Sequence, residues 1–283
     1  MSFLPTPSYI SELVRRNDRD RFLTALFAPA KLRSRLLTLY AFNAEIARIR
    51  EDVRDPMAGL LRLQWWRDLL LNLERGQSPP KGLPIAESLG EVIIHSSLSI
   101  PLLLAVLDAR EQDMSDESLK TLDDLIAYCR QTSSNLSLLG LQCLDVKDEV
   151  TMLASEGVGL GWALTGTIRA LLHHVQVGRN VLPLQLLTKF GLTIHDLDSP
   201  TSAGQVKEVI RVIGSEAEKA LEKARLVSGQ VDLRGLPILL PAVLATQYLR
   251  SIKRMDYNPY NAAMERLRPG IFNLLFQAWR KKY

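Results

Sequence analysis

Acidic residues are missing from one long stretch of this chain. Between residues 157 and 195 the sequence contains no Asp or Glu, although Arg, Lys and His all occur there. Divalent cations such as Mg²⁺ take oxygen ligands, above all carboxylates. We therefore expect no carboxylate metal site on this stretch.

Cysteines and long hydrophobic runs are also scarce. The two cysteines, Cys129 and Cys143, lack metal-ligand spacing and lie in apolar helical contexts, which predicts buried free thiols in a reducing compartment. The longest apolar segment, residues 236–245, is broken by Pro237 and Pro241 and is too short to cross a bilayer. We expect neither a thiolate metal site nor a membrane-spanning helix.

The charge balance is mildly basic, with a formal net charge of +4 and a pI near 9.1. This balance fits an anionic substrate or an anionic membrane surface, but no nucleic-acid-reading motif accompanies it, so we expect no nucleic-acid partner. The first 22 residues lack the apolar core of a signal peptide and carry acids unlike a transit peptide. We expect a cytoplasmic protein. Peripheral contact with the inner membrane, on the matrix side if the chain is mitochondrial, is the alternative.

Hydrophobic residues recur at helical spacing along the chain, and no segment shows the alternation typical of a β-strand. With 283 residues, 47% of them hydrophobic, the chain can bury one large core. The pattern predicts an all-α protein with a single domain over residues 1–283. The longer helices expected outside the central segment cover residues 29–55, 57–73, 85–95, 101–111, 116–129, 205–227 and 236–254.

One further helix, which begins after Asp148 and continues beyond residue 170, is apolar on nearly every face. A helix of this kind belongs in the middle of a larger bundle. Gly157, Gly159, Gly161 and Gly166 interrupt its surface, and each Gly costs a helix about 1 kcal/mol relative to Ala. We infer that a neighbouring helix or a ligand comes close to its backbone.

The C-terminal segment predicts a basic amphipathic helix. Apolar residues recur at helical spacing from Ile271 to Ala278, and Arg280, Lys281 and Lys282 follow. Such a helix either docks on the body of the protein, with its cations near the helix C-terminus, or rests on a membrane surface as a peripheral contact. The sequence favours docking and leaves membrane contact open.

Two segments resemble the signatures of the squalene/phytoene synthase family. Residues 36–52, LLTLYAFNAEIARIRED, are similar to the first signature, and residues 165–183, TGTIRALLHHVQVGRNVLP, are similar to the second. Tyr128 and residues 248–260 are supporting matches. The resemblance implies an isoprenoid-synthase fold, which is a helical bundle around a deep central cavity. It also implies head-to-head prenyl transfer as the activity of the family.

The chain departs from this family at the acidic positions of both signatures. The corresponding residues are Ala47, Arg48 and Glu51 in the first signature and Ala170, His173 and His174 in the second. The resemblance implies that facing carboxylates there hold Mg²⁺, which neutralises the departing diphosphate. Only Glu51 is acidic, and the two adjacent histidines diverge around the helix and make a poor chelating pair. We predict no resident cofactor, and a need for Mg²⁺ only if catalysis survives.

A residual metal site in the first signature would use Glu51, Asp52 and Asp55. Glu51 and Asp55 are four residues apart, so they share one face of a helix. We expect no acid on the opposite wall of the cavity to complete such a site, so this site would be weak.

Three arginines are candidates for binding a phosphate without a metal, because a guanidinium group contacts phosphate bidentately. They are Arg48, Arg169 and Arg179. Structural ion pairs with glutamates, such as Glu45, Glu51 or Glu156, are an equally good interpretation of these arginines.

Degraded acidic motifs are typical of one branch of the family, the proteins similar to mitochondrial complex I assembly factor 6. Residues 17–29, NDRDRFLTALFAP, and residues 62–70, RLQWWRDLL, resemble members of that branch. The resemblance implies a non-catalytic assembly or binding factor for respiratory complex I. Its partners would be respiratory-complex assembly proteins, and its ligand an isoprenoid or lipid-like molecule.

Two alternatives remain open. The first is an active prenyl transferase on farnesyl or geranylgeranyl diphosphate, of the squalene or phytoene synthase type, with a rebuilt metal site or with cationic side chains in place of Mg²⁺. The second is a helical interaction protein whose cavity is filled by side chains such as Trp162, Leu171 and Leu172. Whether the cavity is open or filled distinguishes this second alternative from the other interpretations.

Overall fold

The structure is a computed structural model that describes residues 7–115, 117–264 and 266–283. Within these ranges every regular element is a helix, which confirms the predicted all-α class. The α-helices are α1 (Pro7–Asn17), α2 (Arg19–Ala25), α3 (Ala30–Asp52), α4 (Pro56–Glu74), α5 (Pro84–Ser96), α6 (Ile100–Glu111), α7 (Leu122–Cys129), α8 (Asn135–Cys143), α9 (Glu149–Gln176), α10 (Leu184–Lys189), α11 (Ala203–Arg225), α12 (Leu236–Leu239), α13 (Pro241–Arg254) and α14 (Ile271–Trp279). The shorter elements are η1 (Gln112–Met114), the π-helix η2 (Arg130–Ser134), η3 (Ile194–Asp198), η4 (Pro200–Ser202) and η5 (Leu233–Gly235).

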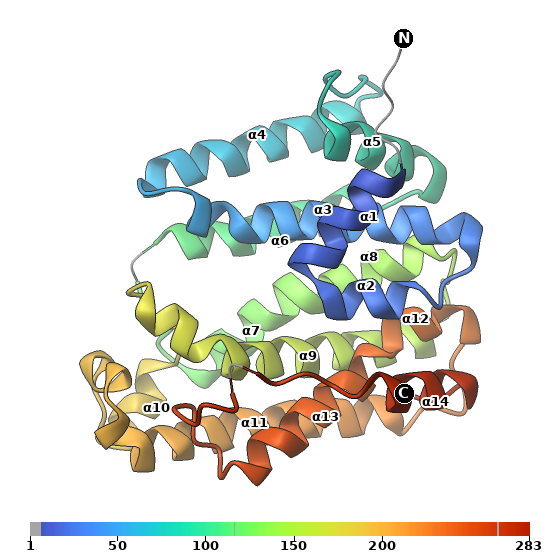
Figure 1. The fold of residues 1–283 in the computed structure, drawn as a ribbon. Coiled ribbons are helices and arrows are strands. Elements are labelled where there is room, and N and C mark those ends of the chain that lie inside the picture. The colour runs from blue at the N-terminus through green and yellow to red at the C-terminus, as the bar shows by residue number, and fades with distance from the viewer. Residues whose placement is uncertain (1–6, 116, 265) are drawn as a thin grey trace.

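The helices form two layers, with α3, α4, α5 and α6 in one and α9, α11 and α13 in the other (Figure 1). Each layer has its own hydrophobic core. One core draws its buried side chains mainly from α3 to α6 and α8, and the other mainly from α9, α11 and α13. Helix α9 contacts α8 and η2 on one side and α11 and α13 on the other. It is therefore the central helix that its apolar sequence predicted.

The glycines of α9 let neighbouring backbone pack closely against it. Its first turn is capped by Asp148, whose carboxylate accepts a hydrogen bond from the Thr151 backbone N–H at 2.7 Å. A Cβ on Gly159 would lie 2.7–2.9 Å from backbone atoms of η2, and one on Gly161 would lie 3.1 Å from a backbone carbonyl of α11. Nothing lies within 4 Å of a Cβ built on Gly166. The close neighbours of Gly159 and Gly161 are therefore helices, whereas Gly166 faces open space.

The helix expected over residues 116–129 is shorter than predicted. Residue 116 lies outside the described residues, and α7 begins only at Leu122. Thr121 and Asp124 form a capping box that fixes this start, because each side chain accepts a hydrogen bond from the backbone N–H of the other. The two carbonyls just before Thr121 accept backbone hydrogen bonds from the start of α10. These carbonyls therefore form hydrogen bonds with another element and do not extend α7 towards its N-terminus.

The apolar helix expected over residues 236–254 is divided in two. Helix α12 ends at Leu239 and α13 begins at Pro241. Proline has no backbone N–H and cannot continue the hydrogen-bonding pattern of the preceding helix. The other long helices lie within a few residues of their expected bounds. No helix in the described part of the chain combines the length and the hydrophobicity that crossing a membrane requires.

Candidate ligand cavity

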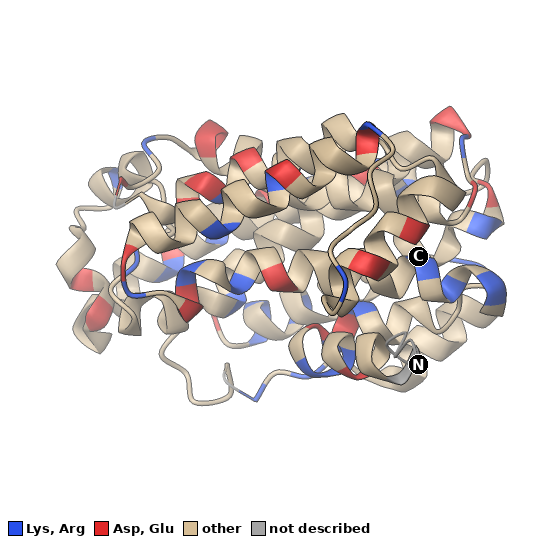
Figure 2. Cartoon of the chain, turned by 90° about the horizontal axis from the view of Figure 1, so that it is seen from above, with Lys and Arg blue, Asp and Glu red and all other residues tan. Residues whose placement is uncertain are grey.

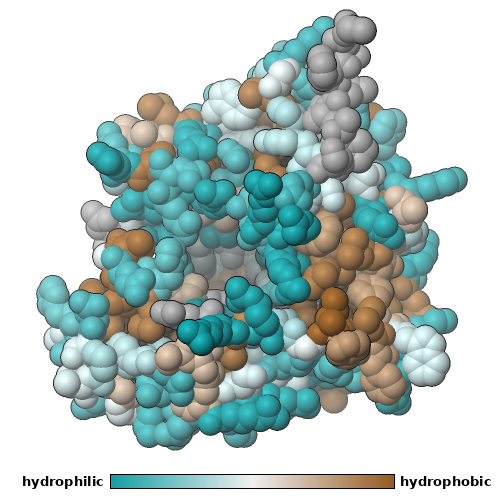
Figure 3. Space-filling view, in the orientation of Figure 1, coloured by the Kyte–Doolittle hydropathy of each residue, from teal (hydrophilic) through white to brown (hydrophobic). Residues whose placement is uncertain are grey.

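A cavity of about 800 Å³ lies between the two layers. Its walls come from α3, α7, η2 and α9, and from the segments that follow α6 and α9. Figure 3 shows the molecule hollowed near its centre, between these layers. Four small residues of α9 leave this space open on the side of the central helix: Ala163, Gly166, Thr167 and Ala170.

The open cavity shows that the interpretation as a filled bundle is wrong. Trp162 lies on the cavity wall and does not occupy its interior. Leu171 points elsewhere, is buried in the core of the α9 layer and does not line the cavity. Leu172 is also absent from the lining.

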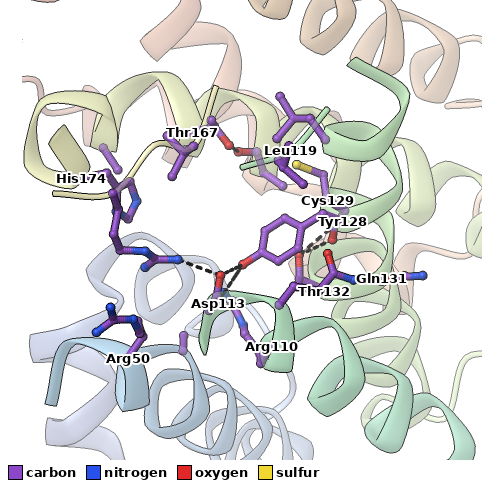
Figure 4. A pocket seen from close by; sticks show the side chains of 18 of the residues that line it. Arg50, Arg110, Asp113, Leu119, Tyr128, Cys129, Gln131, Thr132, Thr167 and His174 are labelled. Carbon is purple, nitrogen blue, oxygen red and sulfur yellow. Dashed lines mark hydrogen bonds and ion pairs between the residues drawn. The ribbon is translucent and has the colours of Figure 1, made fainter. Parts of the chain in front are cut away.

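Asp113, in η1, is the centre of a buried polar cluster in the cavity wall (Figure 4). Its carboxylate accepts hydrogen bonds from Arg110 Nη1 at 3.2 Å, from Arg179 Nη2 at 2.9 Å and from the Tyr128 hydroxyl at 2.9 Å. Arg110 also donates to the Tyr128 hydroxyl at 2.7 Å. One carboxylate therefore compensates two guanidinium groups and joins η1, α6, α7 and the turn after α9.

His174 adds a neutral polar group to this part of the lining. Burial, followed by repulsion from Arg179 and His173, lowers the pKa of His174 to about 4. Within the described part of the chain, His174 Nδ1 and Arg110 Nε are buried and have no hydrogen-bond partner. Buried polar atoms without partners are uncommon in folded proteins. The cavity wall therefore has unused hydrogen-bonding capacity at these two atoms.

The nucleophilic side chains of the lining are protonated at neutral pH. Burial raises the pKa of Cys129 to about 12 and raises the pKa of the Tyr128 hydroxyl above its usual value. Cys129 and Cys143 are both free and buried, as the sequence predicted. The geometry at Cys129 supports a packing role and provides no thiolate.

The two signature segments face each other across the cavity, on α3 and α9. Of the six acidic positions of the family, Ala47, Glu51, Ala170 and His174 line the cavity. Arg48 and His173 do not, although His173 Nε2 lies 3.7 Å from Glu51 Oε1 and so connects the two helices at the protein surface.

The candidates for a residual metal site do not come together. Asp52 pairs with Arg48 at 3.4 Å, and Asp55 caps α4 by accepting a hydrogen bond from the Met57 backbone N–H. Across residues 7–115, 117–264 and 266–283 there is no group of three or more His, Cys, Asp or Glu side chains that could hold a metal ion. The described residues do not fit a cluster of magnesium ions of the kind that the resemblance implies.

The three arginines named as phosphate ligands occupy different places. Arg179 lines the cavity and binds Asp113. Arg48 lies outside the lining and donates to Asn17 at 2.9 Å. Arg169 also lies outside the lining. Its guanidinium is 3.6 Å from the centre of the Tyr248 ring, and its Nη1 is 3.4 Å from Asp20, which also accepts a hydrogen bond from the Tyr248 hydroxyl.

The expectation of no acid on the wall opposite Glu51 needs correction, because Asp113, Glu117 and Asp124 also line the cavity. These residues precede or begin α7 and belong to neither signature, so comparing the signatures alone missed them. Arg110 also lies outside both signatures, whereas Arg50 lies within the first one and was missed because only the acidic positions of the signatures were compared. The supporting match at Tyr128 was the one available signal, because its hydroxyl contacts Asp113.

Comparisons with known proteins agree with this architecture. The profile of the family described as squalene/phytoene synthase matches residues 14–272. The chain is 27% identical to NADH dehydrogenase (ubiquinone) complex I, assembly factor 6, of Bos taurus, over 98% of this chain and 83% of that protein. The protein of the same name from Homo sapiens gives the same identity and coverage. A 15-cis-phytoene synthase of Enterobacter agglomerans is 28% identical, but over only 47% of this chain and 44% of its own length.

Solved structures show the same fold. The squalene synthase HpnC of Alicyclobacillus acidocaldarius superposes with a TM-score of 0.77 at 21% identity, over 90% of this chain and 95% of that one. A dehydrosqualene synthase in complex with a ligand gives 0.78 at 16% identity, over 97% and 94%. These likenesses confirm the expected helical bundle of the isoprenoid synthases. With its profile match over most of its length, the chain belongs to the squalene/phytoene synthase family.

Proposed function

We propose that this protein is a non-catalytic assembly or binding factor for respiratory complex I, and that its cavity holds an isoprenoid or lipid-like ligand. The observation that carries the proposal is an open cavity with the family fold in which the described residues form no carboxylate cluster fit for metal ions. The assembly role is supported by relatives named complex I assembly factor 6, which align with nearly the whole chain.

The volume and lining of the cavity favour binding. Ligand pockets generally span about 300–1,000 Å³, and this cavity falls in that range. Leu119, Leu125, Trp162 and Val181 supply apolar wall for a hydrocarbon chain. Arg110 and Arg179 lie in the same wall and supply positive charge near Asp113.

The chemistry that prenyl transfer needs supports the proposed absence of catalysis. Loss of diphosphate leaves a cation behind, and metal ions neutralise the charge on the departing group. In this cavity the carboxylate of Asp113 is already bound by two guanidinium groups and a tyrosine hydroxyl. A metal ion would have to displace these partners before it could bind there.

A deletion strain tests the proposed function. We expect cells without this gene to lose NADH:ubiquinone oxidoreductase activity and the assembled complex on native gels. The wild-type gene and the Gly166→Ala variant should restore both, because a Cβ at this position meets only open space. The Gly166→Phe variant, which fills the cavity, should restore neither. Normal assembly in the deletion strain would overturn the assembly role, and full rescue by Gly166→Phe would overturn the role of the ligand.

An active prenyl transferase is the second candidate, favoured by family membership and by the open cavity. It predicts diphosphate release from farnesyl or geranylgeranyl diphosphate that requires Mg²⁺ and is lost in Glu51→Gln. We expect no such release from the purified protein.

A further inference from the structure

Helix α14 has two apolar faces, and only one of them is covered. Leu274 is 1% exposed and Ala278 is also buried, so the inner face packs against the core of the α9 layer. On the outer face Phe272 is 83% exposed and Trp279 is 79% exposed, with Phe276 between them. These three residues are three or four positions apart and therefore lie on one side of the helix. Figure 3 shows hydrophobic side chains gathered on this side of the molecule, toward α14.

The outer face of α14 is held in place at both ends of the helix. At the start, Gly270 N donates to Gln247 Oε1 at 2.7 Å. After its end, the buried Tyr283 hydroxyl donates to the Ala224 carbonyl at 2.9 Å, and the Tyr283 carbonyl accepts a hydrogen bond from Arg225 Nε at 3.0 Å. The exposed aromatic residues are thus presented on a fixed helix and not on a loose tail.

The segment that contains α14 is positively charged. Residues 266–283 contain no Asp or Glu and five basic residues, namely Arg266, Arg268, Arg280, Lys281 and Lys282. Figure 2 shows basic residues beside the C-terminal end of the chain. A second copy of this chain would bring the same positive charges together on this face, which opposes self-association.

We propose that the outer face of α14 docks on an anionic membrane surface. Phe272, Phe276 and Trp279 would enter the interfacial region, where aromatic side chains are favoured, while the flanking cations meet lipid phosphates. This face would bind in the plane of the membrane without spanning it. The inference is independent of the assembly role, because it rests on the geometry and charge of α14 alone.

Vesicle co-sedimentation tests the proposal, with the full-length protein and two vesicle types. One type contains phosphatidylcholine with phosphatidylglycerol, and the other contains phosphatidylcholine alone. We expect binding to the anionic vesicles, weakened by added salt because salt screens surface charge. The Phe272→Ser/Trp279→Ser variant should lower the partition coefficient at least about tenfold, since burying each aromatic side chain is favourable. Arg280→Gln/Lys281→Gln should lower it by about fivefold per charge removed.

A matched control is available on α4, where Met57 and Leu61 are also exposed and apolar. Met57→Ser/Leu61→Ser also removes two exposed apolar side chains, and we expect it to bind vesicles like the wild type. Circular dichroism should show that all variants stay folded, because the substituted side chains are exposed. Equal binding by wild type and the Phe272→Ser/Trp279→Ser variant, or no binding to anionic vesicles, would overturn the proposal. A dimer in solution that this double variant abolishes would assign the face to a second copy, and would overturn it as well.

Discussion

Asp113 compensates two guanidinium groups in the cavity wall, so its loss should destabilise the protein. Asp113→Asn removes the negative charge with little change in volume. The side chains of Asp113, Arg110 and Arg179 are 11%, 17% and 21% exposed. Removing one partner of a buried ion pair costs ~3–5 kcal/mol. Because both arginines keep some contact with solvent, we expect a loss of about 2–3 kcal/mol in the free energy of unfolding.

Thermal unfolding followed by far-UV circular dichroism measures this loss. For a chain of this size, the loss corresponds to a fall of about 4–12 °C in Tm. Glu117→Gln is the matched control, because Glu117 lines the same cavity but is exposed, and we expect its Tm to stay near that of the wild type. The double variant Asp113→Asn/Arg179→Gln should recover part of the loss, since it also removes one uncompensated charge. If Asp113→Asn melts at the same temperature as Glu117→Gln, the reasoning about this cluster is refuted.

Three further predictions concern His174, two glycines of α9 and the two cysteines. The pKa of His174 is about 4 in the folded protein, below its usual value of 6.5. Between these two pH values His174 therefore binds a proton in the unfolded chain but not in the folded protein. Stability should fall by about 2 kcal/mol as pH drops through this range, with allowance for partial exposure, and His174→Gln should flatten that part of the Tm–pH profile. Gly159→Ala should lower Tm through a loss of about 1–3 kcal/mol, because its Cβ would collide with backbone, whereas Gly166→Ala should raise Tm slightly; equal melting temperatures would contradict this contrast. Cys129 and Cys143 should react with a thiol reagent only after denaturation, and reaction of the native protein would show that they are accessible.

The helical framework was predictable because local chemistry decides it. Ser99 caps α6 by accepting the Leu102 backbone N–H, and a Ser just before an apolar helical run is a typical helix start. The apolar surface of α9 correctly predicted its central place. The start of α7 was missed although Thr121 and Asp124 have the spacing of a capping box, and part of the segment before it is held by backbone hydrogen bonds to α10. Such pairing between segments distant in sequence leaves no periodic pattern.

The candidate site was predictable only in part. The two signatures located the walls from α3 and α9, and Ala47, Glu51, Ala170 and His174 do line the cavity. Asp113 could not be found in this way, because Arg179, one of its two arginine partners, is 66 positions further along the chain. The glycines of α9 illustrate the same limit. Sequence predicts that something approaches them, but only the structure separates Gly159, which packs against η2, from Gly166, which faces the cavity.

The most direct test of the central claim is the response of the purified protein to farnesyl diphosphate, measured with Mg²⁺ and with a chelator present. Thermal stabilisation and diphosphate release should be followed in the same samples. The account predicts a rise in Tm that does not depend on Mg²⁺, is lost in Gly166→Phe and is accompanied by no release. Release of diphosphate that requires Mg²⁺ would contradict it, because the cavity would then hold the metal-dependent chemistry of the family.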